Sequence, residues 1–384
     1  YIGVIKLKIK VDRQLLLTQL SYISKAIPTK TPLPVLTGIK FVVSDEGLYL
    51  TTSDSDITIN TFLPLEVNDT QVIQIDAVGS IIIPGKYFIE IIKKLNGDTI
   101  EISTFEGNYV TIKCGRSEYT LNGFDVTQYP NIELIKNDDP IHMEKQLLKT
   151  IIRQTVFSTA NSENRPVLTG VNFRYDADEL MCVATDSFRL SKKTVPLNKL
   201  HDSFNIVIPG RSLIELSKIL DDSHNSVDIY LANNQILFQI GNISFQSRLL
   251  DGIYPETKEF VPTTFGIEIK ANYHELLNAF DRAALIARDQ VSNVVKLNIL
   301  PEESKLLITA QSPEVGKVEE EVQVEMISGG ELRIACSALF IIDALKAINN
   351  SDVIMSFNGD MRPFVLRDKY DETTIQLIVP VRME

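Results

Sequence analysis

The sequence predicts an α+β protein built from three copies of one module, each with two helices packed on antiparallel sheets. The chain length and two internal repeats support this fold class. Residues 34–38 and residues 166–170 both read PVLTG, and the match at this offset extends from Leu15 (Leu147) to Asp54 (Asp186). Five identical residues in succession rarely arise by chance, and an internal repeat determines architecture.

A second repeat follows at a different offset. Residues 83–86 read IPGK and residues 208–211 read IPGR. A chain of 384 residues is too long for one hydrophobic core. A third copy is more divergent but keeps the plan. We therefore expect three domains, with boundaries where proline and charged residues interrupt the periodicity, at residues 1–135, 136–257 and 258–384.

The first module reads as helix, four strands, helix and further strands. Asp12 is suited to cap a helix at residues 13–27, which ends before Pro28. A second helix at residues 85–95 stops at an Asn-Gly turn signal. Alternating apolar and polar residues predict strands at residues 39–43, 48–52, 57–62, 71–75, 99–103, 109–114 and 119–121.

The other two modules repeat the helices, at residues 144–158 and 210–220 in the second module and at 272–288 and 337–348 in the third. The second helix of each module has an acidic residue three positions before a lysine. These pairs are Glu90 and Lys93, Glu215 and Lys218, and Asp343 and Lys346.

The composition is typical of a soluble globular protein. Hydrophobic residues make up 44% of the chain and charged residues 23%, and no apolar run is long enough to span a membrane. No signal peptide is visible. The cysteines Cys114, Cys182 and Cys336 are far apart and odd in number, which argues against disulfides or a zinc site and favours a reducing cytoplasm.

The net charge of -12 argues against a nucleic-acid ligand unless the charge is segregated. The six predicted helices hold 13 Lys and Arg against 6 Asp and Glu, a net charge of +7, which leaves -19 for the rest of the chain. If the helices of all modules face one side, each contributing positive charge, that side attracts a polyanion. The alternative is that lysine and arginine simply favour solvated helix faces.

Motifs for catalysis or cofactor binding are missing. None of the four histidines is spaced with other ligands as a metal site requires, and no glycine-rich phosphate loop or GxSxG motif occurs. Asp54 and Asp56 stand between two predicted strands, where a turn is a commoner role than a metal site. We therefore expect no cofactor, no metal and no enzymatic activity.

Three further segments carry a family resemblance: residues 184–190 (ATDSFRL), residues 250–255 (LDGIYP) and residues 377–383 (LIVPVRM). With the three modules and the basic helices, they make the whole chain resemble the bacterial DNA polymerase III beta subunits, the sliding clamps. The resemblance implies a head-to-tail homodimeric ring of six clamp-type domains, with helices lining a hole for double-stranded DNA. Topology would hold such a ring, so its lining needs only weak, sequence-independent attraction to phosphates.

The resemblance also implies a DNA-facing set of basic residues on the helices and in the loop before Pro34. Ser162 matches a further DNA-contacting position, where the family usually has a longer polar residue. The basic candidates are Arg13, Lys25, Lys30, Lys86, Lys93, Lys94, Lys149, Arg153, Arg211, Lys218, Arg282 and Lys346.

The family has a hydrophobic pocket between its second and third domains that receives short peptide tails, with one or two apolar anchors buried in a preformed groove. From the residues alone, core packing is the commoner role for most of these positions, and Glu259 stands where a basic residue can occur. By position the pocket would comprise Leu168, Thr185, Ser187, Phe188, Arg189, Leu190, Pro255, Glu259, Phe260, Pro363, Leu377, Val379, Pro380, Val381 and Arg382.

The family's dimer seam pairs an edge strand of the first domain with one of the third, which satisfies backbone groups that an edge leaves open. Glu118 falls where some members are basic, and from the residues alone the run at residues 319–321 is a solvated face. The implied seam brings Tyr119 and Leu121 onto Leu285 and Ile286, and Lys113 or Arg116 to Glu319, Glu320 and Glu321.

The leading functional hypothesis is a non-enzymatic processivity clamp of the bacterial cytoplasm. The resemblance implies that it tethers the DNA polymerase III catalytic subunit and docks the clamp loader, other polymerases and repair proteins, with no membrane partner. The alternative is a peptide-binding repeat scaffold that does not encircle DNA. A hydrolase with dispersed catalytic residues has no motif to support it.

Overall fold

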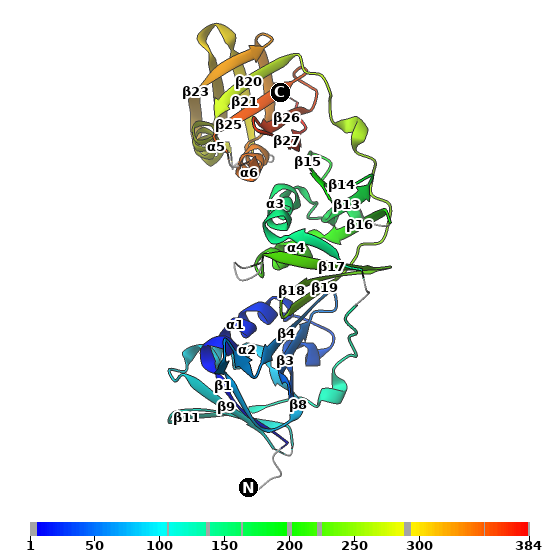
Figure 1. Cartoon of the computed structure of the whole chain (residues 1–384). Coiled ribbons are helices and arrows are strands. Elements are labelled where there is room, and N and C mark those ends of the chain that lie inside the picture. Colours follow the sequence, from blue (N-terminus) through cyan, green and yellow to red (C-terminus); the bar gives the residue numbers. More distant parts are fainter. Residues whose placement is uncertain are drawn as a thin grey trace. The chain divides into compact units, whose positions relative to one another are not determined.

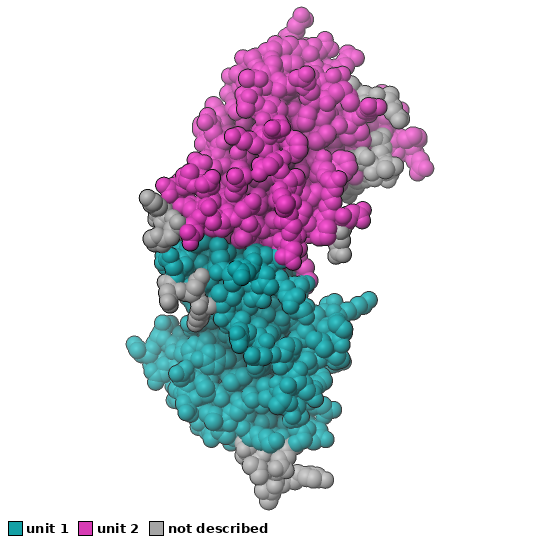
Figure 2. All heavy atoms as spheres, turned by 90° about the vertical axis from the view of Figure 1, so that its right-hand side faces the viewer, with its two compact units in different colours: residues 1–146, 215–249 teal, residues 147–214, 250–384 magenta. Residues whose placement is uncertain are grey.

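The computed structural model describes residues 6–105, 107–135, 139–162, 164–197, 202–220, 225–287, 293–348 and 350–382. The chain forms two compact units, which Figure 2 shows in different colours. Unit 1 comprises residues 1–146 and 215–249, and unit 2 comprises residues 147–214 and 250–384. The second module therefore contributes strands to both units. No helix in the described part of the chain is long and apolar enough to cross a membrane.

Unit 1 contains a five-stranded antiparallel sheet and two helices of the first module. The helices α1 (Arg13–Ile23) and α2 (Gly85–Lys94) pack against each other (Figure 1). The Asp12 carboxylate caps α1 by accepting the Leu15 N–H at 2.8 Å. In spatial order, the strands are β11 (Ser117–Asn122), β10 (Tyr109–Cys114), β9 (Thr99–Thr104), β1 (Leu7–Asp12) and β7 (Ile73–Ala77).

An eight-stranded antiparallel sheet of unit 1 joins the first module to the second. Its junction is the pairing of β4 with β19, in which Ile57 lies opposite Ser247. A separate two-stranded ribbon is formed by β5 (Glu66–Val67) and β6 (Thr70–Gln71). In spatial order, the eight strands are β12 (Ile141–Glu144), β17 (Ser226–Ala232), β18 (Gln235–Ile240), β19 (Ile243–Arg248), β4 (Ile57–Pro64), β3 (Gly47–Ser53), β2 (Gly38–Ser44) and β8 (Gly79–Pro84).

Unit 2 contains a twelve-stranded antiparallel sheet that joins the second module to the third. Its junction is the pairing of β15 with β27, in which Arg189 lies opposite Ile378. In spatial order, the strands are β16 (Phe204–Pro209), β13 (Gly170–Asp176), β14 (Glu179–Thr185), β15 (Arg189–Pro196), β27 (Asp371–Ile378), β26 (Phe364–Asp368), β25 (Asp352–Phe357), β20 (Ile267–Asn272), β23 (Gly316–Ser328), β22 (Lys305–Ser312), β21 (Val294–Leu300) and β24 (Leu332–Ser337).

The third module has an extensive apolar core. Its helices α5 (Tyr273–Ala287) and α6 (Ala338–Ile348) pack together and bury Phe280 and Leu345 against the sheet. The remaining helices are α3 (Lys145–Thr155) and α4 (Gly210–Ser217). Short 3₁₀ turns occur at η1 (Ser24–Ala26), η2 (Pro34–Thr37), η3 (Val126–Gln128), η4 (Val156–Ser158), η5 (Pro166–Thr169), η6 (Lys258–Phe260) and η7 (Pro301–Glu303).

The two PVLTG repeats adopt the same local structure, since η2 and η5 both begin at a proline and both lead into a strand. The glycine that ends each repeat is required by space. A Cβ built on Gly170 would lie 2.7 Å from the backbone oxygen of Ile208. The repeat therefore encodes one turn that packs tightly on a neighbouring strand.

The predicted fold class is confirmed, with corrections to individual elements. Helices α1, α3 and α4 are shorter than predicted, because 3₁₀ turns continue α1 and α3. The predicted strand at residues 71–75 is wrong, since β6 ends at Gln71 and β7 begins at Ile73. Strands β1 and β5 were not predicted. In β8 three consecutive isoleucines are buried, so the alternation typical of a strand is absent.

Candidate functional sites

A pocket of about 480 Å³ opens in unit 2 beside the junction of β15 and β27. Arg165 lines it and was missed by the sequence analysis, although it directly precedes the PVLTG repeat. The other lining residues were all predicted for the peptide pocket. They are Leu168, Thr185, Ser187, Arg189, Leu190, Pro255, Glu259, Phe260, Pro363, Leu377 and Val379.

The other four residues of that prediction do not line the pocket. The side chain of Phe188 is 63% exposed, and its carbonyl accepts the Val379 N–H at 2.9 Å. The Val381 N–H donates to the Ala335 carbonyl at 2.7 Å, which ties the end of the chain to β24. Pro380 and Arg382 flank this bridge.

Strand pairing explains the apolar wall of the pocket. Leu190 and Leu377 lie opposite each other on β15 and β27, and Val365 lies opposite Leu377 on β26. Directly opposed residues point to one face of a sheet, so these side chains form a continuous apolar row. The pocket is therefore preformed by the sheet that joins the two modules.

A tight turn positions the polar rim of the pocket. Ser187 has a φ of 78°, and the Asp186 carboxylate accepts the N–H groups of Phe188 and Arg189 at 2.9 and 3.0 Å. The buried Tyr254 hydroxyl accepts the Thr185 N–H at 3.0 Å, and burial raises the pKa of Tyr254. Hydrogen bonds thus fix the turn from both sides.

Arg189 connects the pocket to α6. Its Nε donates to Asp186 at 3.0 Å and its Nη1 donates to Asp343 at 2.6 Å. The guanidinium also lies 4.5 Å from the ring centre of Phe340 and 5.4 Å from that of Phe157. Asp343 thus stands on α6 as Glu90 and Glu215 stand on their helices, but its carboxylate pairs with Arg189, whereas theirs pair with the lysine three residues later.

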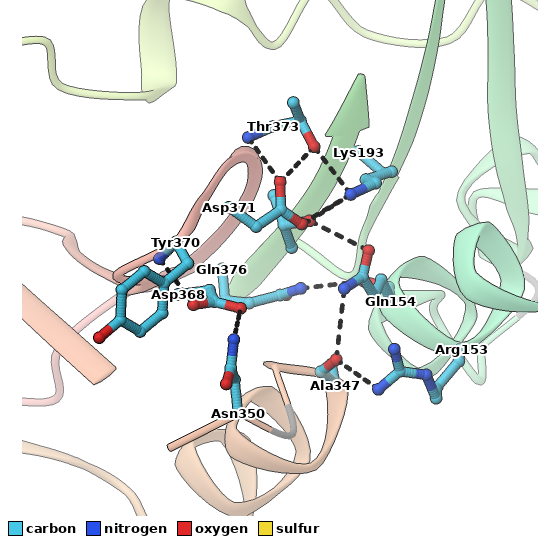
Figure 3. A network of polar contacts seen from close by, with 11 residues as sticks. Arg153, Gln154, Lys193, Ala347, Asn350, Asp368, Tyr370, Asp371, Thr373 and Gln376 are labelled. Atoms are coloured by element: carbon cyan, nitrogen blue, oxygen red, sulfur yellow. Dashed lines mark hydrogen bonds and ion pairs between the residues drawn. The ribbon is translucent and has the colours of Figure 1, made fainter. Parts of the chain in front are cut away.

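A buried ion pair lies across the same junction (Figure 3). The Lys193 Nζ donates to Asp371 at 2.7 Å, to Thr373 at 2.7 Å and to Thr374 at 3.0 Å. Burial alone would raise the pKa of Asp371, but the hydrogen bonds from Lys193 and the two threonines outweigh it and lower this pKa to about 2.

Hydrogen bonds from α3 continue this network (Figure 3). The Gln376 side chain donates to the Gln154 carbonyl at 2.9 Å, and the Thr374 hydroxyl donates to the Gln154 side chain at 3.0 Å. The Arg153 guanidinium donates to the Ala347 carbonyl at 2.8 Å near the end of α6. Polar contacts thus fix α3, β27 and α6 together within unit 2.

The predicted DNA-facing residues fall into two groups. In the first group, Arg13 donates to the carbonyls of Ile92 and Lys93 at 3.1 and 3.2 Å, and each of the other members also has an interaction partner. This group comprises Arg13, Lys93, Lys149, Arg153, Arg211, Lys218 and Arg282. The second group makes no hydrogen bond or ion pair with any described residue, and it comprises Lys25, Lys30, Lys86, Lys94 and Lys346.

The six α-helices keep a positive charge when their observed bounds are used. They contain ten Lys and Arg against five Asp and Glu, a net charge of +5, which leaves -17 for the rest of the chain. The expectation that every module contributes positive helices is wrong for the third. Its α5 and α6 hold two basic and three acidic residues.

Several strands have an open edge among the described residues, and two of them, β11 and β23, belong to the predicted seam. β11 is the last strand of its sheet, and its Tyr119 is 42% exposed. The first half of β23 pairs only with β22, since its pairing with β20 begins at Val324. Nearby, Leu285 on α5 is 59% exposed, whereas Ile286 packs partly on the core.

Several predicted seam charges already have partners within the chain. Arg282 donates to both oxygens of Glu320 at 2.8 and 2.6 Å and holds the pKa of Glu320 below its usual value. Glu321 pairs with Lys305 at 2.9 Å. Lys113 pairs with Glu118 at 3.4 Å across the β10–β11 hairpin. Arg116 and Glu319 make no ion pair with a described residue, and Leu121 is half-buried on β11.

The turn predicted at Asp54 is confirmed, because its carboxylate accepts the N–H groups of Asp56 and Ile57 at 3.1 and 2.8 Å. The part of the chain that the structure describes holds no group of three or more His, Cys, Asp and Glu suited to a metal ion. His201 and His224 lie outside that part.

Comparisons with known proteins give one consistent result. Models of the DNA polymerase III beta subunit match its N-terminal domain at residues 7–133, its central domain at 142–256 and its C-terminal domain at 258–382. The beta sliding clamp of Bacillus subtilis is 45% identical, covering 98% of this chain and all of that protein. The beta sliding clamp of Staphylococcus aureus is 42% identical, covering 97% and 98%.

Solved structures agree in fold. The crystal structure of the Bacillus subtilis DNA polymerase sliding clamp matches with a TM-score of 0.94 and 44% identity, covering 99% of this chain and all of that one. A Pseudomonas aeruginosa sliding clamp bound to griselimycin matches with a TM-score of 0.89 and 25% identity, covering 98% and 100%. The chain belongs to the DNA polymerase III beta subunit family, the non-catalytic sliding clamps of bacterial DNA replication.

Proposed function

We propose that this chain works as a homodimeric ring that encircles double-stranded DNA and tethers the replicative polymerase for processive synthesis. The observation that carries the proposal is the way its modules join. Both junctions within the chain are continuous antiparallel sheets, and a strand edge remains open in the first module and in the third. Two copies joined head to tail satisfy both edges by the same kind of pairing.

The proposed seam pairs β11 of one copy with the first half of β23 of the other. Tyr119 and Leu121 would then pack on Leu285, and Arg116 would meet the unpaired carboxylate of Glu319. Glu320 and Glu321 keep their ion-pair partners within the chain. They form part of the strand edge but contribute little electrostatic attraction across the seam.

The proposed DNA-facing surface is formed by the α-helices. Its free cations are the lysines of the second group, whereas Arg13 and Arg153 mainly hold helix ends. Few free cations suit the function, because a ring that topology retains needs only weak, sequence-independent attraction in order to slide.

The pocket of unit 2 is proposed to dock short peptide motifs of the DNA polymerase III catalytic subunit, the clamp loader, other polymerases and repair proteins. Leu190, Leu377 and Val379 supply an apolar wall for an anchoring side chain. Arg165 supplies a positive charge at the rim, whereas Arg189 is held by Asp186 and Asp343. We also propose the three domains at residues 1–135, 136–257 and 258–384, and a cytoplasmic location.

Retention on DNA tests the ring. The protein is assembled by its loader on a nicked circular plasmid, and the bound fraction is measured after dilution. We expect retention on the circle and loss within the same period after the plasmid is cut once, because the ring slides off a free end. Equal retention on both forms contradicts the topological mechanism. A monomeric mass with intact peptide binding favours the alternative of a peptide-binding scaffold.

Two exposed phenylalanines test the peptide pocket. Phe260 lines the pocket and is 57% exposed, whereas Phe188 is 63% exposed and does not line it. We expect Phe260→Ala to weaken binding of a peptide with two apolar anchors by about tenfold, as for a peripheral aromatic contact. Phe188→Ala is the matched control and should change the dissociation constant by less than about twofold. Equal losses in both variants contradict the assignment.

A further inference from the structure

A second cavity of about 570 Å³ lies in unit 1, beside the junction of β4 and β19. Its apolar floor includes Leu33, Leu36 and Ile132. Its remaining walls carry hydroxyl, amide and charged groups. This polar part includes Thr58, Gln235, Gln246, Arg248, Asp56 and Glu133.

The cavity is built on the same strand pairing as the peptide pocket. Arg248 donates its N–H to the Asp56 carbonyl at 2.9 Å, and Val379 donates its N–H to the Phe188 carbonyl at the same distance. These bonds continue the pairings of β4 with β19 and of β15 with β27 in the same register. Each position around the cavity therefore has a counterpart in the pocket of unit 2.

The adjoining turns are also equivalent. Ser55 has a φ of 84°, close to the 78° of Ser187. The Asp54 carboxylate accepts two backbone N–H groups, as does that of Asp186. The match extends to Leu36, which stands in the first PVLTG repeat where Leu168 stands in the second. We call this shared arrangement of strands and turn the pocket frame.

The two pockets differ in the side chains that the pocket frame presents. In unit 1, Thr58 lies opposite Gln246 and Gln235 lies opposite Arg248, so these four side chains share one face of the sheet. By register, their counterparts in unit 2 are apolar. These are Leu190, Leu377, Pro363 and Val379.

The side-chain amide of Gln246 fixes one wall of the cavity through two hydrogen bonds. It accepts the Ile135 N–H at 2.9 Å and donates to the Glu133 carbonyl at 3.1 Å. Arg248 differs, because its exposed guanidinium makes no hydrogen bond or ion pair with any described residue. The cavity thus presents one unpaired cation, with the amide of Gln235 beside it.

We propose that this cavity is a second ligand site, which binds an extended peptide through one carboxylate-ended side chain held by Arg248. The hydroxyl of Thr58 and the amide of Gln235 favour polar neighbours over apolar anchors. Asp56 and Glu133 on the walls disfavour a second carboxylate, so a ligand with a single acidic side chain fits best. The site goes beyond the proposed function and does not depend on ring closure.

Methyl NMR of the full chain tests the proposal. The probes are three capped tripeptides at millimolar concentration, Gly-Glu-Gly, Gly-Gln-Gly and Gly-Leu-Gly. We expect the glutamate peptide to shift the methyl signals of Leu33, Leu36 and Ile132 and to leave those of Leu168 and Leu377 unchanged. The glutamine peptide should bind more weakly, because it lacks the charge, and the leucine peptide should leave the unit 1 signals unchanged.

Two variants make the test specific to Arg248. Arg248→Val, which installs the counterpart residue, should weaken binding of the glutamate peptide by about tenfold, and Arg248→Lys should retain most of it. The proposal is overturned if none of the peptides shifts the unit 1 methyl signals, or if Arg248→Val binds the glutamate peptide as tightly as the unchanged protein. Failure of DNA retention leaves this readout intact, so the two proposals are separately testable.

Discussion

Lys193 shows how one buried charge stabilises the junction of two modules. Its side chain is only 8% exposed, and three oxygen acceptors replace the water that it loses. A buried ammonium without its carboxylate is strongly unfavourable, because desolvation is then uncompensated. The pair therefore makes the structure of unit 2 depend on the ionisation of Asp371.

Asp371→Asn should lower the free energy of unfolding of unit 2 by about 2 kcal/mol at neutral pH, since Asp371 is partly solvated. The folded-state pKa of Asp371, about 2, is below its usual value of 3.8. The stabilisation is therefore complete above about pH 4 and is lost as the pH falls toward 2. Urea unfolding at several pH values measures this. The exposed Asp360→Asn is the control and should stay within about 0.5 kcal/mol.

A double variant tests whether Lys193 and Asp371 stabilise the fold as a pair. Lys193→Met with Asp371→Asn should recover part of the lost stability, because no unpaired ammonium remains buried. If the double variant is as unstable as the sum of the two single variants, Lys193 and Asp371 act independently and the ion pair is not the cause.

Single residues could be predicted where their partners are close in sequence. The turn at Asp54 and the pairs Glu90–Lys93 and Glu215–Lys218 involve neighbours within one turn of chain. Asp343 was placed correctly on its helix, but its partner, Arg189, is far away in sequence. The family resemblance indicated most of the residues around the pocket, whereas no sequence pattern marked Arg165 as a pocket residue.

At the scale of elements, the open edges of β11 and β23 are exposed strand surfaces that a soluble protein must protect. Glu319 on β23, which makes no ion pair with a described residue, discourages pairing between two identical β23 edges. β11 carries Tyr119 and Leu121 and suits an apolar contact. The two edges therefore complement each other better than either complements itself.

Tyr119→Asp or Leu285→Asp should convert the proposed dimer to a monomer. Each change places a carboxylate in an apolar seam, which costs desolvation of that carboxylate. Light scattering should give a mass near 43.1 kDa instead of about twice that value. Ile253→Asp is the control, because Ile253 is 95% exposed and belongs to neither edge strand, so its variant should remain dimeric. A dimer that persists in both seam variants rules out this pairing.

Helices and strands could be predicted where one face of the element is buried and the opposite face is solvated. The helices and most strands of the first module have that pattern. β8 lacks it, because Ile81, Ile82 and Ile83 are all buried. β6 and β7 were merged because Val72, a residue type that favours strands, is the only residue between them. Such elements depend on tertiary packing that a local pattern does not carry.

At the scale of the whole molecule, the sequence repeats mark three modules, whereas compactness divides the chain into two units. The difference arises because strands of the second module pair with both neighbours. The repeats reflect the order of the modules along the chain, whereas strand pairing determines which parts of the chain form one compact unit. Charge follows a third division, since the α-helices carry +5 and the remainder carries -17.

This charge division predicts which lysines attract DNA. Removing a lysine that contacts a phosphate lowers the slope of log affinity against log salt by about 0.9. Lys86, Lys94 and Lys346 are exposed on helices and make no hydrogen bond or ion pair with a described residue, so replacing all three with alanine should lower the slope by up to about three. The matched control replaces Lys6, Lys258 and Lys296, which are exposed outside the α-helices. Titration of duplex DNA at several salt concentrations measures both slopes, and equal reductions would mean that the helices do not face DNA.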